Sequence, residues 1–322
     1  MIKRKLGNSN LDVSILGLGC MGMSEWYGET NDEESLATIH AALDAVINFF
    51  DTADVYGNGH NEILLSKVLK ERRDEIIIAT KFGFLPKEGG ISGKPEYAKQ
   101  ACEASLSRLG TDCIDLYYLH RIDTNVPVEE SVGAMSELVK EGKVKYLGLS
   151  EASAESLKRA CTVHPISALQ TEYSIWIKDV EEKILPACRE LNIAFVPYSP
   201  LGRGFLTGKV KDKNNFDEKD FRRKVPLFDD DNFTANLNIV KELELIAEEK
   251  KCTPGQIAIA WLFHQGDNIF PIPGTKRRTY LKENIKSVDI KLTEDELNRI
   301  NKLSNFVHGM RKNEGGMKLV NL

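Results

Sequence analysis

Short apolar runs alternate with amphipathic segments eight times along this chain of 322 residues, and this pattern constrains the fold more than any other feature. The apolar runs, expected to be strands, occupy residues 15–19, 49–51, 76–81, 114–120, 146–150, 166–170, 194–198 and 269–272. Apolar residues at helical spacing predict a helix that begins at about residue 31. The same spacing recurs near 61–69, 95–109, 127–140, 153–163, 180–191, 237–251, 253–264, 279–287 and 293–303. Eight such units predict an α/β fold, the (β/α)8 TIM barrel, with its active site at the carboxyl ends of the strands.

Outside the eight repeated units, the sequence predicts a hairpin and two long segments within a single domain. Residues 3–6 and 11–13 flank an Asn/Gly-rich turn, which predicts an N-terminal β-hairpin. No linker or change of composition interrupts the sequence, so residues 1–322 are expected to form a single domain. Residues 201–236 and 304–322 are longer than ordinary loops, and loops of that length on a barrel commonly cover ligand.

Charge and cysteine content exclude several classes of function. A net charge of −5 leaves no basic surface for nucleic acid or an anionic membrane. The chain lacks both an apolar signal core and a run long enough to span a bilayer, which predicts a cytoplasmic protein. Its six cysteines form no Cys-x-x-Cys pair and its histidines show no metal-binding spacing, so reduced thiols and no metal are expected.

Four groups at or just beyond consecutive strand ends form a chemically coherent set. They are Asp51 and Tyr56 from the second unit, Lys81 from the third and His120 from the fourth. A lysine beside a tyrosine favours the phenolate, and a carboxylate keeps the lysine charged. We therefore expect Lys81 to lower the pKa of Tyr56, and His120 to orient a carbonyl oxygen. Such a site can protonate an oxygen as it gains negative charge, while the hydride must come from a cofactor.

Two glycine-rich segments match nucleotide-binding motifs only in part. Residues 17–22 satisfy Gly-x-Gly-x-x-Gly, but a dinucleotide fingerprint opens directly into a helix, and here the helix begins only near Asn31. Residues 202–209 suggest a P-loop, yet Val210 stands where Ser or Thr must follow the lysine. Neither segment supports a Rossmann or P-loop fold.

Dispersed motifs in a fixed order make the sequence resemble the aldo-keto reductase superfamily over nearly its whole length. They include Gly17-Leu18-Gly19, Asp51-Thr52-Ala53-Asp54-Val55-Tyr56-Gly57, Ala79-Thr80-Lys81, Leu119-His120, Gly148-Leu149-Ser150, Leu169-Gln170, Tyr198-Ser199-Pro200-Leu201-Gly202 and Ile272-Pro273-Gly274-Thr275-Lys276. The resemblance implies a tetrad of Asp51, Tyr56, Lys81 and His120, with Tyr56 as the general acid. The chain is most similar to the bacterial and plant-type branch of pyridoxal and aldehyde reductases, which implies reduction of small carbonyls.

The resemblance also implies a cofactor site for NADPH/NADP+. Ser150 and Gln170 would bind the nicotinamide carboxamide, and Tyr198 would stack on the ring. The cluster Lys276-Arg277-Arg278 precedes a helix N-terminus and suits the 2′-phosphate, unless it is only a solvated basic turn. The other residues carried over are Met21, Gly22, Ser199, Leu201, Gly202, Gly204, Lys209, Arg222, Gly274, Thr275, Tyr280, Glu283 and Asn284.

Substrate recognition is less constrained by the sequence. Four aromatic side chains beyond strand ends are candidates for an apolar substrate wall or, alternatively, for ordinary packing: Trp26, Tyr27, Phe84 and Trp176. Substrate choice is expected to depend on residues 82–93, 121–127, 201–236 and the tail 304–322. The pattern identifies neither the physiological carbonyl nor the oligomeric state, monomer or homo-oligomer.

Three residues depart from the family pattern. Glu151 replaces an Asn, so the carboxamide contact is expected to rest on Ser150 and Gln170. Tyr280 replaces an Arg and is expected either to stack on adenine or to pack. Val46 replaces a Gly that would end the first helix in a left-handed conformation, which predicts backbone strain there.

Two other functions are compatible with parts of the pattern. The same fold serves as the NADP(H)-binding β subunit of potassium channels, a regulatory role that predicts slow turnover and a stable tetramer. A barrel aldolase would use Lys81 in a Schiff base, but Asp51 is expected to keep that lysine protonated.

Overall fold

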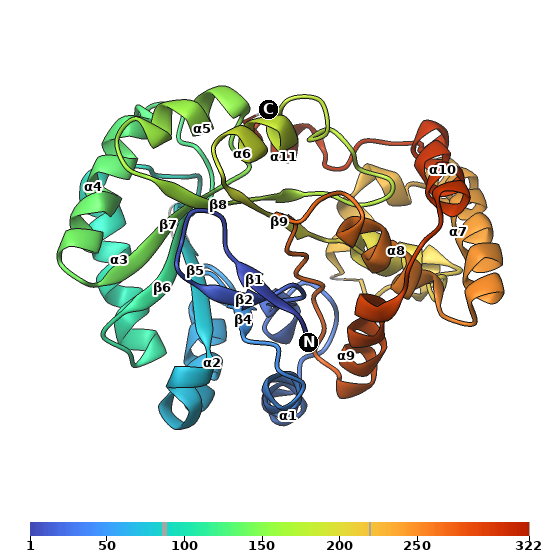
Figure 1. Ribbon diagram of the computed structural model, residues 1–322, viewed down its shortest axis with the longest axis horizontal. Coiled ribbons are helices and arrows are strands. Elements are labelled where there is room, and N and C mark those ends of the chain that lie inside the picture. The colour runs from blue at the N-terminus through green and yellow to red at the C-terminus, as the bar shows by residue number, and fades with distance from the viewer. Residues whose placement is uncertain (86–88, 219, 322) are drawn as a thin grey trace.

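The computed structural model describes residues 1–85, 89–218 and 220–321, and it contains the expected barrel (Figure 1). The strands are β1 (Lys3–Lys5), β2 (Asp12–Ser14), β3 (Leu18–Gly19), β4 (Phe49–Asp51), β5 (Ile77–Phe82), β6 (Ile114–Leu119), β7 (Val144–Ser150), β8 (Ile166–Glu172) and β9 (Ala194–Tyr198). The α-helices are α1 (Asp32–Asp44), α2 (His60–Arg72), α3 (Pro95–Leu109), α4 (Val128–Lys140), α5 (Ala154–Cys161), α6 (Ile184–Glu190), α7 (Asp230–Lys250), α8 (Pro254–Phe263), α9 (Arg278–Ile285), α10 (Glu294–Leu303) and α11 (Glu314–Met317).

Short 3₁₀ helices mark the connections. They are η1 (Met21–Met23), η2 (Arg73–Glu75), η3 (Gly202–Thr207), η4 (Lys213–Asn215), η5 (Phe221–Lys224), η6 (Pro226–Phe228), η7 (Lys286–Asp289) and η8 (Ser304–Phe306). Four of them, η3 to η6, fall within the long segment after β9, which therefore has more local structure than a simple loop.

Seven parallel strands run in the order β3 to β9, and a further segment closes the ring. That segment, residues 269–272, was expected to be the eighth strand, and its backbone hydrogen-bonds to β9 on one side and to the β3 region on the other. Pro271 and Pro273 accept bonds from the N–H groups of Gly17 and Gly19. Because proline has no N–H to donate, the ladder on that side is incomplete and only isolated bridges form.

The N-terminal hairpin, β1 paired with β2, closes the end of the barrel opposite the carboxyl ends of the strands. Figure 1 shows it crossing the ring of strands. Leu6 and Val13 are fully buried in one cluster with inward-facing strand residues such as Phe49 and Ala194. Gly7 permits this contact, because an added Cβ would lie 2.4 Å from the Ser167 carbonyl oxygen.

Local signals explain most helix boundaries, with one clear exception. Pro95 begins α3 and the left-handed Gly110 ends it, as the pattern predicted. Thr293 forms a capping box with Glu296 at the start of α10. Helix α7 begins at Asp230 rather than near residue 237, because the acidic first turn favours the helix dipole and hides the start of the apolar stripe in a polar sequence.

The six cysteines are all free thiols, as expected. No helix in the described part of the chain has the length and apolarity needed to cross a bilayer.

Candidate active site

The four candidate acid–base groups meet at the carboxyl ends of β4, β5 and β6. Parallel pairing sets Asp51 beside Ala79 of β5, two residues before Lys81, and His120 follows β6 directly. All four side chains are buried, with Lys81 fully enclosed and Tyr56 only 9% exposed. We call this group, Asp51, Tyr56, Lys81 and His120, the tetrad.

Lys81 is the centre of the tetrad. Its Nζ donates to Asp51 Oδ1 at 2.5 Å, to the Thr52 carbonyl oxygen at 2.7 Å and to the Tyr56 hydroxyl at 3.3 Å. Gln170 Nε2 donates to the other carboxylate oxygen of Asp51 at 2.7 Å. Burial lowers the pKa of Lys81, but the charges of Asp51 and Tyr56 and their hydrogen bonds to Lys81 together outweigh burial, and the net pKa is raised. Lys81 is therefore a fixed ammonium group beside the phenol.

The pKa of Tyr56 differs from the sequence-based prediction. Lys81 does lower it, but burial raises it more, so the net pKa lies above its ordinary value. The expectation of a net lowering was wrong because it considered the neighbouring charge without the desolvation of the phenolate. Tyr56 is consequently protonated at neutral pH, which is the form that a proton donor requires.

His120 faces Tyr56 and Phe84, with ring centroids 5.9 Å and 4.7 Å away. Burial and the charges of Arg121 and Lys81 hold its pKa well below the ordinary value. Its Nδ1 has no hydrogen-bond partner among the described residues. A neutral imidazole in this position can bind a polar atom without adding charge.

The three groups expected at the nicotinamide lie at the same edge, on the neighbouring strands β7, β8 and β9. Ser150 Oγ accepts from Arg121 Nη1 at 3.2 Å. Gln170 is buried and bonded to Asp51, while the Tyr198 hydroxyl donates to Glu151 Oε1 at 2.5 Å. These side chains thus link the tetrad to the last strands of the barrel.

Glu151 takes part in a buried ion pair that the sequence did not predict. It is fully buried with a left-handed φ of 54°, and both carboxylate oxygens pair with Arg311 at 3.1 and 3.0 Å. Against the effect of burial, Lys312, Arg311 and Arg121 lower its pKa to about 2. Nothing in the sequence identified Arg311 as its partner, because the two residues are 160 positions apart.

The residues expected at the pyrophosphate form a tight turn after β9. Ser199, Gly202 and Gly204 all have positive φ, at 52°, 55° and 92°. Gly202 lies on the ring of Trp176, where a Cβ would come within 2.7 Å, so the turn depends on this glycine. Leu201 precedes it and is partly buried.

The cations expected at the phosphates lie on the segment after this turn and at or just before the start of α9, and most of them have protein partners. Ion pairs join Lys209 to Glu283 at 2.8 Å, Arg222 to Asp220 at 2.6 Å, and Arg278 to Glu34 at 2.8 Å. Lys276 Nζ donates to the carbonyl oxygens of residues 27–29. We call Lys209, Arg222, Lys276, Arg277 and Arg278 the cation rim.

The other expected cofactor residues lie on the same side of the molecule. Gly274 pairs with Gly19 of β3, next to the turn of η1 that holds Met21 and Gly22. Thr275 and Asn284 are buried, whereas Tyr280 is 40% exposed and its ring faces Lys209 Nζ at 4.5 Å. A polar strand edge, an aromatic face, a glycine turn and a ring of cations together fit a nicotinamide dinucleotide.

The four candidate wall aromatics lie in three different places. Phe84 touches His120 in the tetrad. Trp176 is instead stacked on Phe205, at 4.9 Å, in the aromatic core under η3. Trp26 packs against Phe221 and Tyr27 faces Arg222, so both contact the long segment after β9. Parts of the expected specificity segments 82–93, 201–236 and 304–322, namely residues 86–88, 219 and 322, lie outside the described residues.

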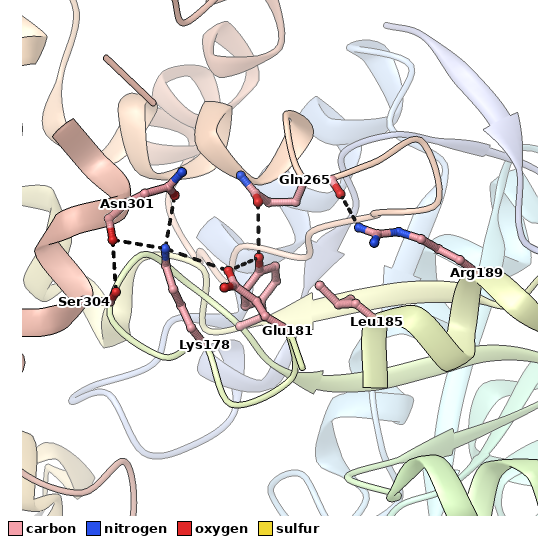
Figure 2. A pocket seen from close by; sticks show the side chains of 8 residues that line it. Lys178, Glu181, Leu185, Arg189, Gln265, Asn301 and Ser304 are labelled. Carbon is pink, nitrogen blue, oxygen red and sulfur yellow. Dashed lines mark hydrogen bonds and ion pairs between the residues drawn. The ribbon is translucent and has the colours of Figure 1, made fainter. Parts of the chain in front are cut away.

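A separate pocket of about 450 Å³ shares no residue with the tetrad (Figure 2). Its polar side chains bond to one another: Lys178 to Asn301, Tyr173 to Glu181, and Arg189 to the Gln265 carbonyl oxygen. This pocket therefore presents few free polar groups to a ligand.

The fold and the tetrad define a (β/α)8 barrel with a buried acid–base centre at its strand ends. Residues 15–305 match the Aldo/keto reductase family, and the chain belongs to that family. Membership identifies an oxidoreductase, supports carbonyl reduction with a nicotinamide cofactor, and agrees with the expected small carbonyl substrate.

Solved structures agree with this assignment over nearly the full length. The glycerol dehydrogenase AKR11B4 from Gluconobacter oxydans is 28% identical with a TM-score of 0.86, covering 95% of this chain and 96% of its own. A thermostable aldo-keto reductase in complex with the inhibitor epalrestat is 30% identical, with a TM-score of 0.76 and coverage of 94% and 100%. The aldo-keto reductase AKR11C1 from Bacillus halodurans, in its holo form, is 29% identical, with a TM-score of 0.76 and coverage of 98% and 99%.

Proposed function

We propose that this protein reduces small aldehydes or ketones to alcohols with NADPH, and that Tyr56 donates the proton. The observation that carries the proposal is the contact between the Tyr56 hydroxyl and Lys81 Nζ at 3.3 Å, with Lys81 held by Asp51. When bound, the cofactor supplies the hydride. Tyr56 gives its proton to the carbonyl oxygen, and the adjacent ammonium group stabilises the phenolate that remains.

The other side chains of the site orient the reactants. Neutral His120 would hydrogen-bond the carbonyl oxygen and direct it toward Tyr56. Ser150 and Gln170 would hold the carboxamide, and Tyr198 would pack on the ring. The cation rim supports a preference for NADPH, because several positive charges near one helix N-terminus suit a 2′-phosphate.

The test is NADPH consumption with a panel of small carbonyls, comparing wild type with Tyr56→Phe. We expect kcat to fall by a factor of about 10²–10⁴ with little change in KM, because the variant retains the ring but loses the acid. Full activity in Tyr56→Phe would refute the assignment of the donor. Parallel titrations with NADPH and NADH test the cofactor preference separately.

A further inference from the structure

Two cations beside the tetrad have no part in the chemistry proposed above. Arg121 follows His120 directly, and its Nη1 donates to two neutral acceptors, the His120 carbonyl oxygen at 2.6 Å and Ser150 Oγ at 3.2 Å. Its guanidinium lies 5.5 Å from the ring of Phe84, and its buried Nε has no hydrogen-bond partner among the described residues. Lys312 is the second cation, and it comes from the C-terminal tail.

The tail is anchored so that Lys312 lies beside Glu151, whose Oε1 is 3.7 Å from its Nζ. Arg311 is 3% exposed and forms the two-point ion pair with Glu151. Further along the tail, the Asn321 N–H donates to the Glu151 carbonyl oxygen at 3.1 Å, and Asn321 Oδ1 accepts from the Ser153 N–H. Lys312, next to this anchor, places its Nζ 5.8 Å from the ring of Tyr198, with a side chain only 12% exposed.

The charges around this anchor do not balance. The cations are Arg121, Arg203, Arg311 and Lys312, and the carboxylates that pair with them are Glu151, Glu172 and Asp179. Asp51 and Lys81 neutralise each other and leave this balance unchanged. One positive charge is therefore left over in a largely buried region, which is unfavourable unless an anion joins it.

The electrostatic effect of these cations reaches the reacting groups. Burial, followed by Arg121, Lys81 and Lys312, lowers the pKa of His120. Burial is also the main reason that the pKa of Lys312 falls to about 8, with Arg121 contributing to the fall and Glu151 opposing it. In the structure, Arg121 Nη1 contacts the His120 carbonyl oxygen and Lys312 Nζ lies 5.8 Å from the ring of Tyr198, so the two cations lie next to the residues at the ends of β6 and β9.

We propose that the carbonyl substrate carries a carboxylate, which Arg121 and Lys312 bind while the carbonyl oxygen faces Tyr56 and His120. This inference rests on the proposed reductase function and narrows its substrate to aldehyde or keto acids. Arg121 can contribute Nε and its second terminal nitrogen, and Lys312 contributes a flexible ammonium group. Neutral carbonyls of the same shape would leave the surplus charge unpaired.

The experiment compares 4-carboxybenzaldehyde with its methyl ester as substrates under NADPH. We expect wild type to prefer the acid by at least about tenfold in kcat/KM, as for one hydrogen bond to a charged group. Lys312→Met should remove about tenfold from the acid and change the ester less than twofold, whereas Lys312→Arg should keep the preference. The matched control is Lys318→Met, which removes a positive charge from an exposed site in the same tail.

A binding measurement separates failure of this inference from failure of the proposed function. Calorimetry with NADP+ present would compare 4-(hydroxymethyl)benzoate with its methyl ester in wild type and Lys312→Met. Tighter binding of the acid, lost in Lys312→Met, supports the anion site even if no carbonyl is reduced, a result that would refute only the reductase proposal. Equal binding and equal kcat/KM for acid and ester would overturn the inference and leave the reductase function intact.

Discussion

The tetrad and the cation rim differ in how far their ion pairs are exposed to solvent. Lys81 and Asp51 are almost wholly enclosed on strands, whereas the side chain of Lys209, on a loop, is 48% exposed and that of Arg278, at the start of α9, is 55% exposed. A buried pair is costly to break, but an exposed pair contributes at most about 1 kcal/mol. The tetrad is therefore preorganised, whereas under the proposed function the rim would exchange Glu283 or Glu34 for a cofactor phosphate at little cost.

The largest expected effect is on the tetrad. We expect Lys81→Met to lower kcat/KM about 10³-fold and to destabilise the protein by about 3–5 kcal/mol, because Asp51 would be buried without its partner. Steady-state kinetics and urea unfolding would measure both. The double variant Asp51→Asn/Lys81→Met should recover much of the stability without recovering activity. A double variant as unstable as Lys81→Met would mean that the charge pair does not hold this region together.

The same contrast explains which features could be predicted from the sequence. The tetrad could be predicted because the ends of parallel strands share one face, so Asp51, Lys81 and His120 converge wherever the barrel forms. The partner of Glu151 could not be predicted, because Arg311 lies in an irregular tail without periodicity. Burial of Tyr56 was equally hidden, since it depends on packing from several loops, and this reversed the expected pKa shift.

A second prediction concerns Asp54, a buried carboxyl that, unlike Asp51, forms no ion pair within the described part of the chain. It is 7% exposed, its Oδ1 has no partner among the described residues, and burial followed by Glu62 raises its pKa to about 7. Between about pH 4 and 7 the folded protein therefore binds more protons than the unfolded chain, so stability falls as pH rises.

Replacing this carboxyl should remove that loss. We expect Asp54→Asn to be more stable than wild type by about 2 kcal/mol at pH 8, with the difference shrinking toward pH 4. Urea unfolding at several pH values would measure the difference. A gain that is the same at all pH values would show that Asp54 is not protonated in the folded state.

A third prediction concerns the exchangeable pairs of the cation rim. Arg278→Met should raise the Kd for NADPH about tenfold, and Glu34→Gln should lower it about two- to fivefold by releasing Arg278 from its partner. The Kd for NADH should change less than twofold in both variants, because NADH lacks the 2′-phosphate. Fluorescence titration measures all four values. If Glu34→Gln weakens NADPH binding, the pair positions Arg278 and does not compete with the phosphate.

The smallest expected effect lies just after the end of α1, at Val46. The sequence predicted a left-handed backbone at Val46, and its φ of 63° confirms this. Its side chain is 48% exposed, so little burial is lost on truncation. Val46→Gly relieves about 1–2 kcal/mol of strain but costs about 0.5–1 kcal/mol in backbone entropy, which leaves a gain below about 1 kcal/mol.

We expect this gain to appear as a rise in Tm of roughly 1–2 °C by calorimetry, with kcat/KM and the Kd for NADPH unchanged. Val163→Gly is the matched control, because Val163 is 41% exposed near the end of α5 but does not have a positive φ. There the substitution brings only the entropic cost and should lower Tm. If both variants lowered Tm, relief of the left-handed strain at Val46 would be smaller than the backbone entropy that glycine adds to the unfolded chain.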